Sequence, residues 1–144
     1  MRQSMVLNKR VFLDVNIVVD ILDTKRKSHI DTKKLLNVIY KNNIEIVISE
    51  DMLSTIFYIV KDKKAVLNFF KVIQKSWVVS PFGDEVVKKS VELALRESVD
   101  FEDVLQCLCA KHNQCDTLIT NDNNFIDCGL SICTVYEFLN EKSV

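Results

Sequence analysis

The sequence predicts a three-layer α/β/α sandwich built on a parallel sheet. Short apolar runs, rich in β-branched residues, alternate along the chain with longer segments whose apolar residues recur at helical spacing. Strands that alternate with helices form a parallel sheet that is covered on both faces. The 144 residues include only two glycines and one proline, so no linker divides the chain. We therefore expect residues 1–144 to form a single domain.

Five apolar runs are the expected strands. The first begins at Val11, and its continuous apolar residues are typical of a strand that is buried on both faces. The other four runs are equally short, and a longer segment of helical period separates most of them. The expected strands span residues 11–14, 45–48, 77–80, 117–120 and 131–135.

Seven helical patterns lie between and after these strands. Asn16 is well placed to cap the first helix, because asparagine is a preferred N-cap residue. Two helices fall between the second and third strands, and the break at 62–64 is consistent with a helix hairpin that stands off the sheet. The expected helices span residues 16–22, 31–42, 50–61, 63–75, 84–97, 101–113 and 136–141.

The formal net charge of −1 neither supports nor excludes a nucleic-acid substrate. A protein held mainly by phosphate contacts would show a basic surface. Short basic clusters occur at 25–27, 33–34, 61–64 and 88–89, and such clusters are usually solvated faces. No apolar run approaches the ~18 residues of a membrane span. Since the first residues also carry no signal-peptide pattern, we expect a cytoplasmic protein.

The five cysteines are expected to be reduced. Their odd number and the absence of a secretion signal argue against a disulfide framework. Their spacings, even with His29 and His112, do not give a tetrahedral zinc site. Cys107 and Cys109 fall in an apolar helical pattern, where free cysteine behaves as a small hydrophobic residue.

Acidic residues fall at three places near the expected strand ends. Asp14 ends the first strand, Asp100 and Asp103 open the helix at 101–113, and Asp122 follows the fourth strand. Each has an ordinary explanation as a helix cap, a first-turn acid or a turn residue. These explanations do not account for the fact that the acidic residues at all three places converge at one edge of a parallel sheet, where ligands bind. Converging carboxylates favour Mg²⁺ or Mn²⁺, and such a site can support phosphodiester hydrolysis.

The chain resembles the PIN-domain family, in particular the VapC-type ribonuclease toxins of toxin–antitoxin pairs. Three motifs carry the resemblance over essentially the whole chain: FLDVNIVVD at 12–20, DFEDVLQ at 100–106 and TNDNNF at 120–125. The resemblance implies a five-stranded parallel sheet with an acidic pocket that binds Mg²⁺ or Mn²⁺.

Residue roles follow from the resemblance at the matching positions. It implies that Asp14, Asp103 and Asp122 are the catalytic, metal-binding acids and that Asp100 is an auxiliary acid. Asn16 and Thr120 would be groups that orient the carboxylates; both belong to the same motifs.

The sequence departs from the family pattern at two positions. Thr55 stands where the family usually has a glutamate, in the helix after the second strand, and Val15 replaces a common threonine beside Asp14. Asp51 lies four residues before Thr55 on the same helical face, so it is a candidate substitute, directly or through a metal-bound water. Alternatively, Glu50 and Asp51 only favour the first turn of their helix.

Two functions therefore remain open. The first is a Mg²⁺- or Mn²⁺-dependent endoribonuclease that acts on RNA as a toxin and is restrained by an antitoxin protein. The alternative is a catalytically weakened PIN-like domain that binds RNA or protein. We also expect a homodimer, because the helices at 50–61 and 63–75 carry more apolar surface than one sheet face buries. These apolar residues are Leu53, Ile56, Phe57, Val60, Val66, Phe69, Phe70 and Ile73.

Overall fold

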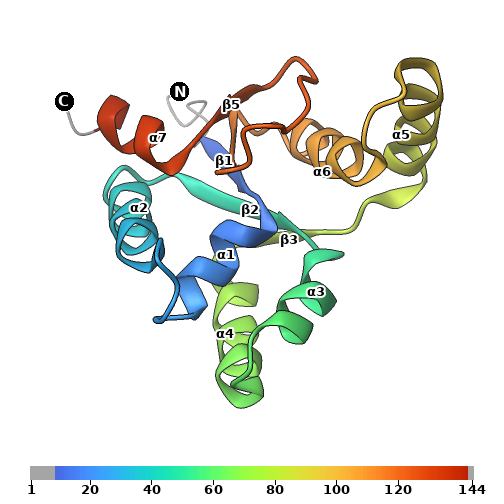
Figure 1. Cartoon of the computed structure of the whole chain (residues 1–144). Coiled ribbons are helices and arrows are strands. Elements are labelled where there is room, and N and C mark those ends of the chain that lie inside the picture. The colour runs from blue at the N-terminus through green and yellow to red at the C-terminus, as the bar shows by residue number, and fades with distance from the viewer. Residues whose placement is uncertain (1–8, 143–144) are drawn as a thin grey trace, which may run out of the picture.

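A computed structural model describes residues 9–142 as a five-stranded parallel sheet covered by helices on both faces (Figure 1). The strand order is β3-β2-β1-β4-β5. The strands are β1 (Arg10–Leu13), β2 (Glu45–Ser49), β3 (Val78–Ser80), β4 (Thr117–Ile119) and β5 (Ser131–Cys133). The helices are α1 (Val15–Leu22), α2 (His29–Lys41), α3 (Met52–Ile59), α4 (Lys63–Ser76), α5 (Gly83–Glu97), α6 (Phe101–His112) and α7 (Val135–Lys142). The predicted fold class is confirmed.

The central strand β1 explains why the core lies where it does. Val11, Phe12 and Leu13 are all buried, because helices cover both faces of the sheet and every side chain of the strand meets a packed layer. Phe12 pairs with Val47 of β2 on one side and with Leu118 of β4 on the other. The two inner strand pairs therefore place the ends of β1 and β4 next to one another.

The helices divide into two groups. Helix α1 contacts α2 and α3, α2 contacts α7, and α3 contacts α4, whereas α5 and α6 pack against each other. Figure 1 shows α5 and α6 on one side of the sheet and α1, α2 and α4 on the other. Helix α6 contacts the sheet at β2 and β4.

The start of α1 differs from the expectation in one respect. Asp14, not Asn16, is the N-cap: its backbone is extended, and its Oδ1 accepts a hydrogen bond of 2.9 Å from the backbone N–H of Val15. The N-cap is the last residue before the helical backbone. Because the helix begins at Val15, Asn16 lies inside its first turn and is exposed.

The helix hairpin expected between β2 and β3 is present. Helix α3 contacts both α1 and α4, and the Asp62 side chain caps α4 by accepting a hydrogen bond of 3.1 Å from Ala65 N–H. In Figure 1 the two helices extend away from the sheet. No helix within residues 9–142 is long and apolar enough to cross a membrane.

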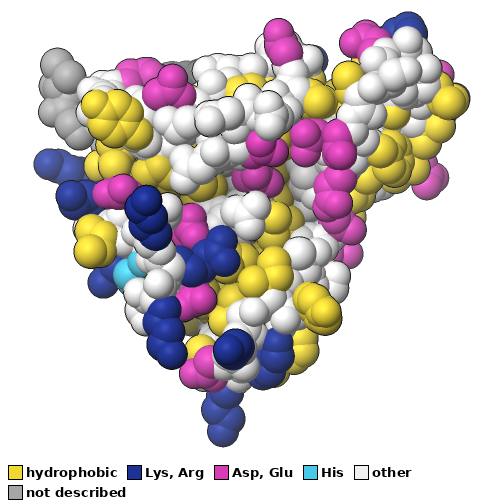
Figure 2. Space-filling view, viewed as in Figure 1, with side chains coloured by type: hydrophobic (Ala, Val, Ile, Leu, Met, Phe, Trp, Pro, Cys, Tyr) yellow, Lys and Arg dark blue, Asp and Glu magenta, His cyan; other side chains and the backbone are white. Residues whose placement is uncertain are grey.

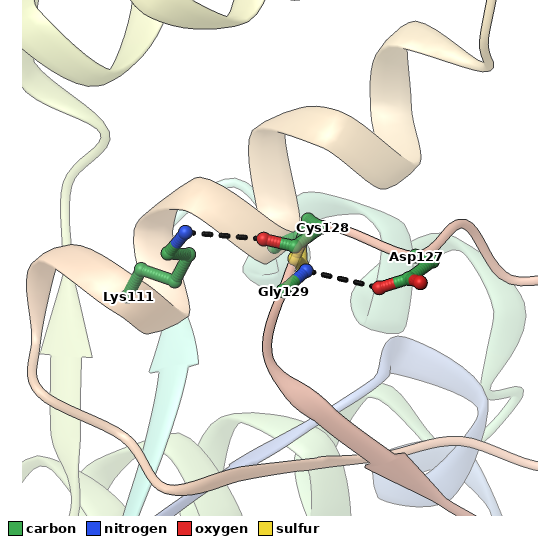
Figure 3. Close-up of a disulfide and its surroundings, with 5 residues drawn as sticks. Lys111, Asp127, Cys128 and Gly129 are labelled. Carbon is green, nitrogen blue, oxygen red and sulfur yellow. Dashed lines mark hydrogen bonds between the residues drawn. A yellow bond between two sulfur atoms is a disulfide. The ribbon is translucent and has the colours of Figure 1, made fainter.

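One prediction about the cysteines is wrong. Cys107 of α6 and Cys128, in the segment before β5, form a disulfide (Figure 3), with Cα atoms 6.5 Å apart. The Lys111 side chain donates a hydrogen bond of 3.0 Å to the Cys128 carbonyl and holds the same segment against α6. The two cysteines are 21 residues apart in sequence, so only the packing of this segment on α6 brings them together.

The other three cysteines are free, as expected. Cys109 and Cys115 are buried, and Cys133 is half-buried. Burial raises the pKa of the Cys115 thiol to about 12 and that of Cys133 to about 11. Free thiols in such surroundings stay protonated and pack as small apolar groups.

Candidate active site

The acidic residues singled out in the sequence line one cleft of about 390 Å³ at the carboxyl ends of β1 and β4. Helix α3 closes one side of this acidic cleft and α6 the other. Figure 2 shows acidic side chains gathered in the region between α6 and α3, while Lys and Arg side chains gather around α2 and α4. The lining includes every predicted acid and Asn16: Asp14, Asn16, Asp51, Asp100, Asp103 and Asp122, together with Val15, Met52, Thr55, Ile59, Glu102 and Gln106.

Asp14 is held by two hydrogen bonds at the end of β1. Besides the bond from Val15, its Oδ2 accepts a hydrogen bond of 2.7 Å from the Thr120 hydroxyl. Thr120 is buried at the end of β4, and its hydroxyl oxygen also accepts a hydrogen bond of 3.0 Å from Asp122 N–H. Thr120 thus links Asp14 to the turn that carries Asp122. Asn16 lines the cleft but makes no hydrogen bond to a carboxylate in the part of the chain that the structure describes.

The first turn of α6 supplies further carboxylates. Asp100 caps the helix, as predicted, by accepting a hydrogen bond of 2.9 Å from Asp103 N–H. The pKa of Asp103 is raised to about 6, first by burial and then by the nearby charges of Asp100, Asp122, Asp14 and Glu102, in that order of importance. The carboxylates therefore lie close enough to repel one another.

The surroundings of Asp14 have opposing effects on the pKa of its carboxyl group. Burial raises its pKa, the hydrogen bonds from Thr120 and Val15 lower it, and the charge of Asp122 raises it again, with a net upward shift. No lysine, arginine or histidine of residues 9–141 lines the acidic cleft. The repulsion among these carboxylates is therefore not relieved by a protein cation in the cleft.

On the opposite wall, Thr55 and Asp51 both line the cleft. Thr55 is half-buried, and no carboxylate occupies its position on α3. Asp51 is exposed just before the start of α3, and its charge contributes to the raised pKa of Glu102, after the larger effect of burial. Asp51 and Glu102 therefore approach each other across the cleft.

Glu102 and Gln106 line the cleft although the sequence analysis did not single them out. They lie four residues apart on α6, so they share a helix face. This spacing, next to the predicted site residue Asp103, is the feature of the sequence that could have indicated that both residues face the cleft. Gln106 is almost fully buried, and its Oε1 atom accepts no hydrogen bond. An unpaired buried oxygen of this kind needs a partner, such as an ion or an ordered water.

The donor set of the cleft fits a hard divalent cation. Its candidate ligands are oxygen atoms, which Mg²⁺ and Mn²⁺ prefer, and the unpaired oxygen of Gln106 can accept a hydrogen bond from a water bound to such a cation. Within residues 9–142, no three carboxylate, imidazole or thiol groups already form a group that could hold a metal ion. Binding therefore requires the carboxylates to move together or to be joined through water ligands, which Mg²⁺ commonly retains.

A family model and a sequence relative both match most of this chain. A family model described as "PIN domain" matches residues 10–124. Ribonuclease VapC1 of Aquifex aeolicus (strain VF5) is 30% identical over 135 residues, which cover 91% of this chain and 94% of that protein.

Solved structures are similar in fold at low sequence identity. VapC20 of Mycobacterium tuberculosis, a toxin that cleaves the sarcin–ricin loop, matches with a TM-score of 0.68 at 12% identity, covering 83% of this chain and 95% of that one. A chain of the VapBC2 complex of Rickettsia felis, bound to a promoter DNA fragment, gives 0.65 at 18% identity, with 87% and 98% covered. A toxin–antitoxin complex from Klebsiella pneumoniae gives 0.68 at 16% identity, with 88% and 98% covered.

Proposed function

The chain belongs to the PIN-domain family of nucleases, and on that premise we propose that it is a Mg²⁺- or Mn²⁺-dependent endoribonuclease, the toxin of a type II toxin–antitoxin pair. One observation carries the proposal: the acidic residues at the end of β1, at the start of α6 and in the turn after β4 line a single cleft that contains no protein cation from residues 9–141. The 30% identical relative is a ribonuclease, which supports RNA as the substrate.

In this proposal Asp14, Asp103 and Asp122 hold the cation, and Asp100 is an auxiliary acid. A bound divalent cation would supply charge neutralisation at the scissile phosphate and a water of lowered pKa. The protein groups provide its position. Thr120 orients Asp14 through the 2.7 Å hydrogen bond, and Asn16 is a further polar group at the rim of the cleft.

The number of carboxylates on the wall formed by α3 affects how strongly the cleft binds a cation, and therefore its nuclease activity. Thr55 provides no carboxylate there, but Asp51 and Glu102 approach each other across the cleft and can together supply the missing negative charge. The alternative function, a weakened PIN-like domain that binds RNA or protein, is favoured by Thr55 and by the lack of a preformed group of three metal-binding side chains in residues 9–142.

We propose that the protein acts in the cytoplasm and that it has two protein partners, an antitoxin and a second copy of this chain. The antitoxin rests on the toxin–antitoxin complexes among the similar folds. For the dimer, most of the apolar residues expected at the interface are buried or half-buried in this chain's own core. Of the expected residues only Phe57 is exposed, and with four further exposed apolar side chains on α3 and α4 it forms the candidate surface: Phe57, Tyr58, Ile59, Leu67 and Val72. Light scattering at micromolar concentration tests the dimer, and a monomer mass would contradict it.

The function is tested by incubating a mixed RNA pool with the antitoxin-free protein in Mg²⁺ or Mn²⁺ and in EDTA. We expect cleavage that requires the metal and is lost in Asp14→Asn. A matched control is Asp84→Asn, which replaces an exposed acid in the first turn of α5, outside the acidic cleft. Absence of cutting by folded, metal-supplied protein would favour the binding module, and full activity of Asp14→Asn would refute the assigned site.

A further inference from the structure

A second cleft, of about 370 Å³, adjoins the acidic cleft and has a different electrostatic character. The two clefts share three lining residues, Asp14, Asn16 and Asp122. The second cleft continues over the connection between α1 and α2, where its lining includes two basic side chains, Arg26 and Lys27. Two cationic side chains, next to the carboxylate of Asp20, thus lie beside the acidic cleft.

Arg26 is held in place by a buried carboxylate. Its Nε donates a hydrogen bond of 2.6 Å to Oδ1 of Asp20, whose residue is only 6% exposed. The surrounding connection is also tied down: Arg26 N–H donates to the Asp23 carbonyl, and Nδ1 of His29 donates to the Asp20 carbonyl at 2.8 Å. The guanidinium group therefore has little conformational freedom to lose on binding a ligand.

The remaining donors of Arg26 are available. In the described part of the chain, the two terminal nitrogens of its guanidinium group donate no hydrogen bond to protein, and its side chain is 36% exposed. Lys27 is exposed and has neither a hydrogen bond nor an ion pair within residues 9–142. If Arg26 served only to stabilise the fold, its ion pair with Asp20 would be enough. That role does not account for the free terminal N–H groups of Arg26 or for the neighbouring Lys27.

We propose that Arg26 and Lys27 bind a backbone phosphate of single-stranded RNA, next to the phosphodiester that is cut in the acidic cleft. The inference rests on the proposed nuclease function. A planar guanidinium with free terminal N–H groups matches the oxygen atoms of a phosphate, and an adjacent ammonium adds a point charge. An RNA strand is favoured over an acidic peptide because the second cleft shares lining residues with the acidic cleft, so one substrate chain could lie along both.

The test measures binding of a fluorescein-labelled 12-nucleotide single-stranded RNA at several KCl concentrations. All proteins carry Asp103→Asn to prevent cutting. We expect Arg26→Ala to weaken binding about tenfold, because a charge-assisted hydrogen bond is lost. The slope of log K against log salt should also fall in magnitude by about 0.7, the value for one phosphate contact on a single strand.

Two further variants separate recognition from folding. Lys27→Ala removes a charge without removing an intramolecular hydrogen bond or ion pair, and it should reduce the same slope by about 0.7. Arg96→Ala is the matched control, because it removes an exposed arginine that also pairs with a carboxylate, on α5, away from both clefts. It should leave binding and slope unchanged.

The outcomes distinguish this inference from the function on which it rests. If the wild-type chain cuts RNA but Arg26→Ala and Lys27→Ala bind like Arg96→Ala, the phosphate site is refuted and the nuclease stands. If the wild-type chain does not cut, yet both substitutions reduce the slope, the nuclease is refuted and the phosphate site stands. Displacement of the RNA by hexaglutamate at equal concentration would overturn RNA as the ligand in favour of an acidic peptide.

Discussion

Replacing Asp103 by asparagine is predicted to stabilise the metal-free protein while abolishing its activity. The carboxyl pKa of Asp103 is raised from 3.8 to about 6, first by burial and then by Asp100, Asp122, Asp14 and Glu102. Asparagine is neutral and similar in shape, and the Asp103 carboxylate accepts no hydrogen bond within residues 9–141 that the change would break. The substitution therefore removes mainly repulsion and burial of charge.

The magnitude follows from linkage between folding and proton binding. An acid whose pKa is higher in the folded state weakens folding once it ionises, so the penalty is absent well below pH 3.8, grows up to about pH 6 and is constant above that. A rise of this size corresponds to roughly 3 kcal/mol without screening. Because the side chain is partly exposed to solvent, we expect about 1 kcal/mol.

Urea and thermal unfolding in EDTA measure the effect. At pH 7.5, Asp103→Asn should be more stable than wild type by about 1 kcal/mol, or about 3 °C in Tm for a chain of this length. At pH 4.5 the difference should shrink to about a third, since the folded wild-type carboxyl group is then mostly protonated. Saturating Mg²⁺ should reverse the order, because it stabilises only a protein that binds it.

The control for this comparison is Asp84→Asn, in the first turn of α5, which lies outside the acidic cleft. It should show neither the gain at pH 7.5 nor the reversal in Mg²⁺. A destabilising Asp103 carboxylate is ruled out if Asp103→Asn is no more stable than wild type at pH 7.5, or if its advantage is the same at pH 4.5 and pH 7.5.

Three further substitutions test other parts of the site and fold. Thr120→Val should reduce RNA cleavage and destabilise the protein by about 1 kcal/mol, because the Asp14 carboxylate loses its hydroxyl donor; unchanged kcat/KM would contradict this. Cys128→Ser should lower the free energy of unfolding under non-reducing conditions by about 3 kcal/mol, the value for a loop of this length, with Cys133→Ser as control; equal stability of the reduced and unreduced wild type would contradict it. Thr55→Glu should tighten Mn²⁺ binding in calorimetry, because it adds a carboxylate to the cleft wall; weaker binding would show that this position does not face the metal.

The elements of the fold could be predicted from local patterns, because buried parallel strands and amphipathic helices differ in period. The errors lie at boundaries. Both Asp14 and Asn16 are good capping residues, and only the backbone geometry shows that Asp14 takes the cap and α1 begins at Val15. The hydrogen bond from Thr120 to Asp14 spans 106 residues, so no local pattern could indicate its geometry.

Long-range packing explains what the sequence analysis missed. The pairing of Cys107 with Cys128 depends on how the segment after β4 packs on α6, which the composition argument could not address. Glu102 was hidden by its ordinary explanation as a first-turn acid, and Gln106 by its place in an apolar pattern. Arg26 lay in a basic cluster that is usually a solvated face, and only the buried Asp20 beside it distinguishes it.

The most direct test of the central claim is calorimetric titration of Mn²⁺ into the antitoxin-free protein at pH 6, in two buffers of different ionisation enthalpy. We expect binding that Asp14→Asn abolishes, with release of about half a proton from Asp103, since its pKa is about 6. No heat of binding, or binding that is the same in wild type and Asp14→Asn, would contradict a metal site in this cleft and support the binding module instead.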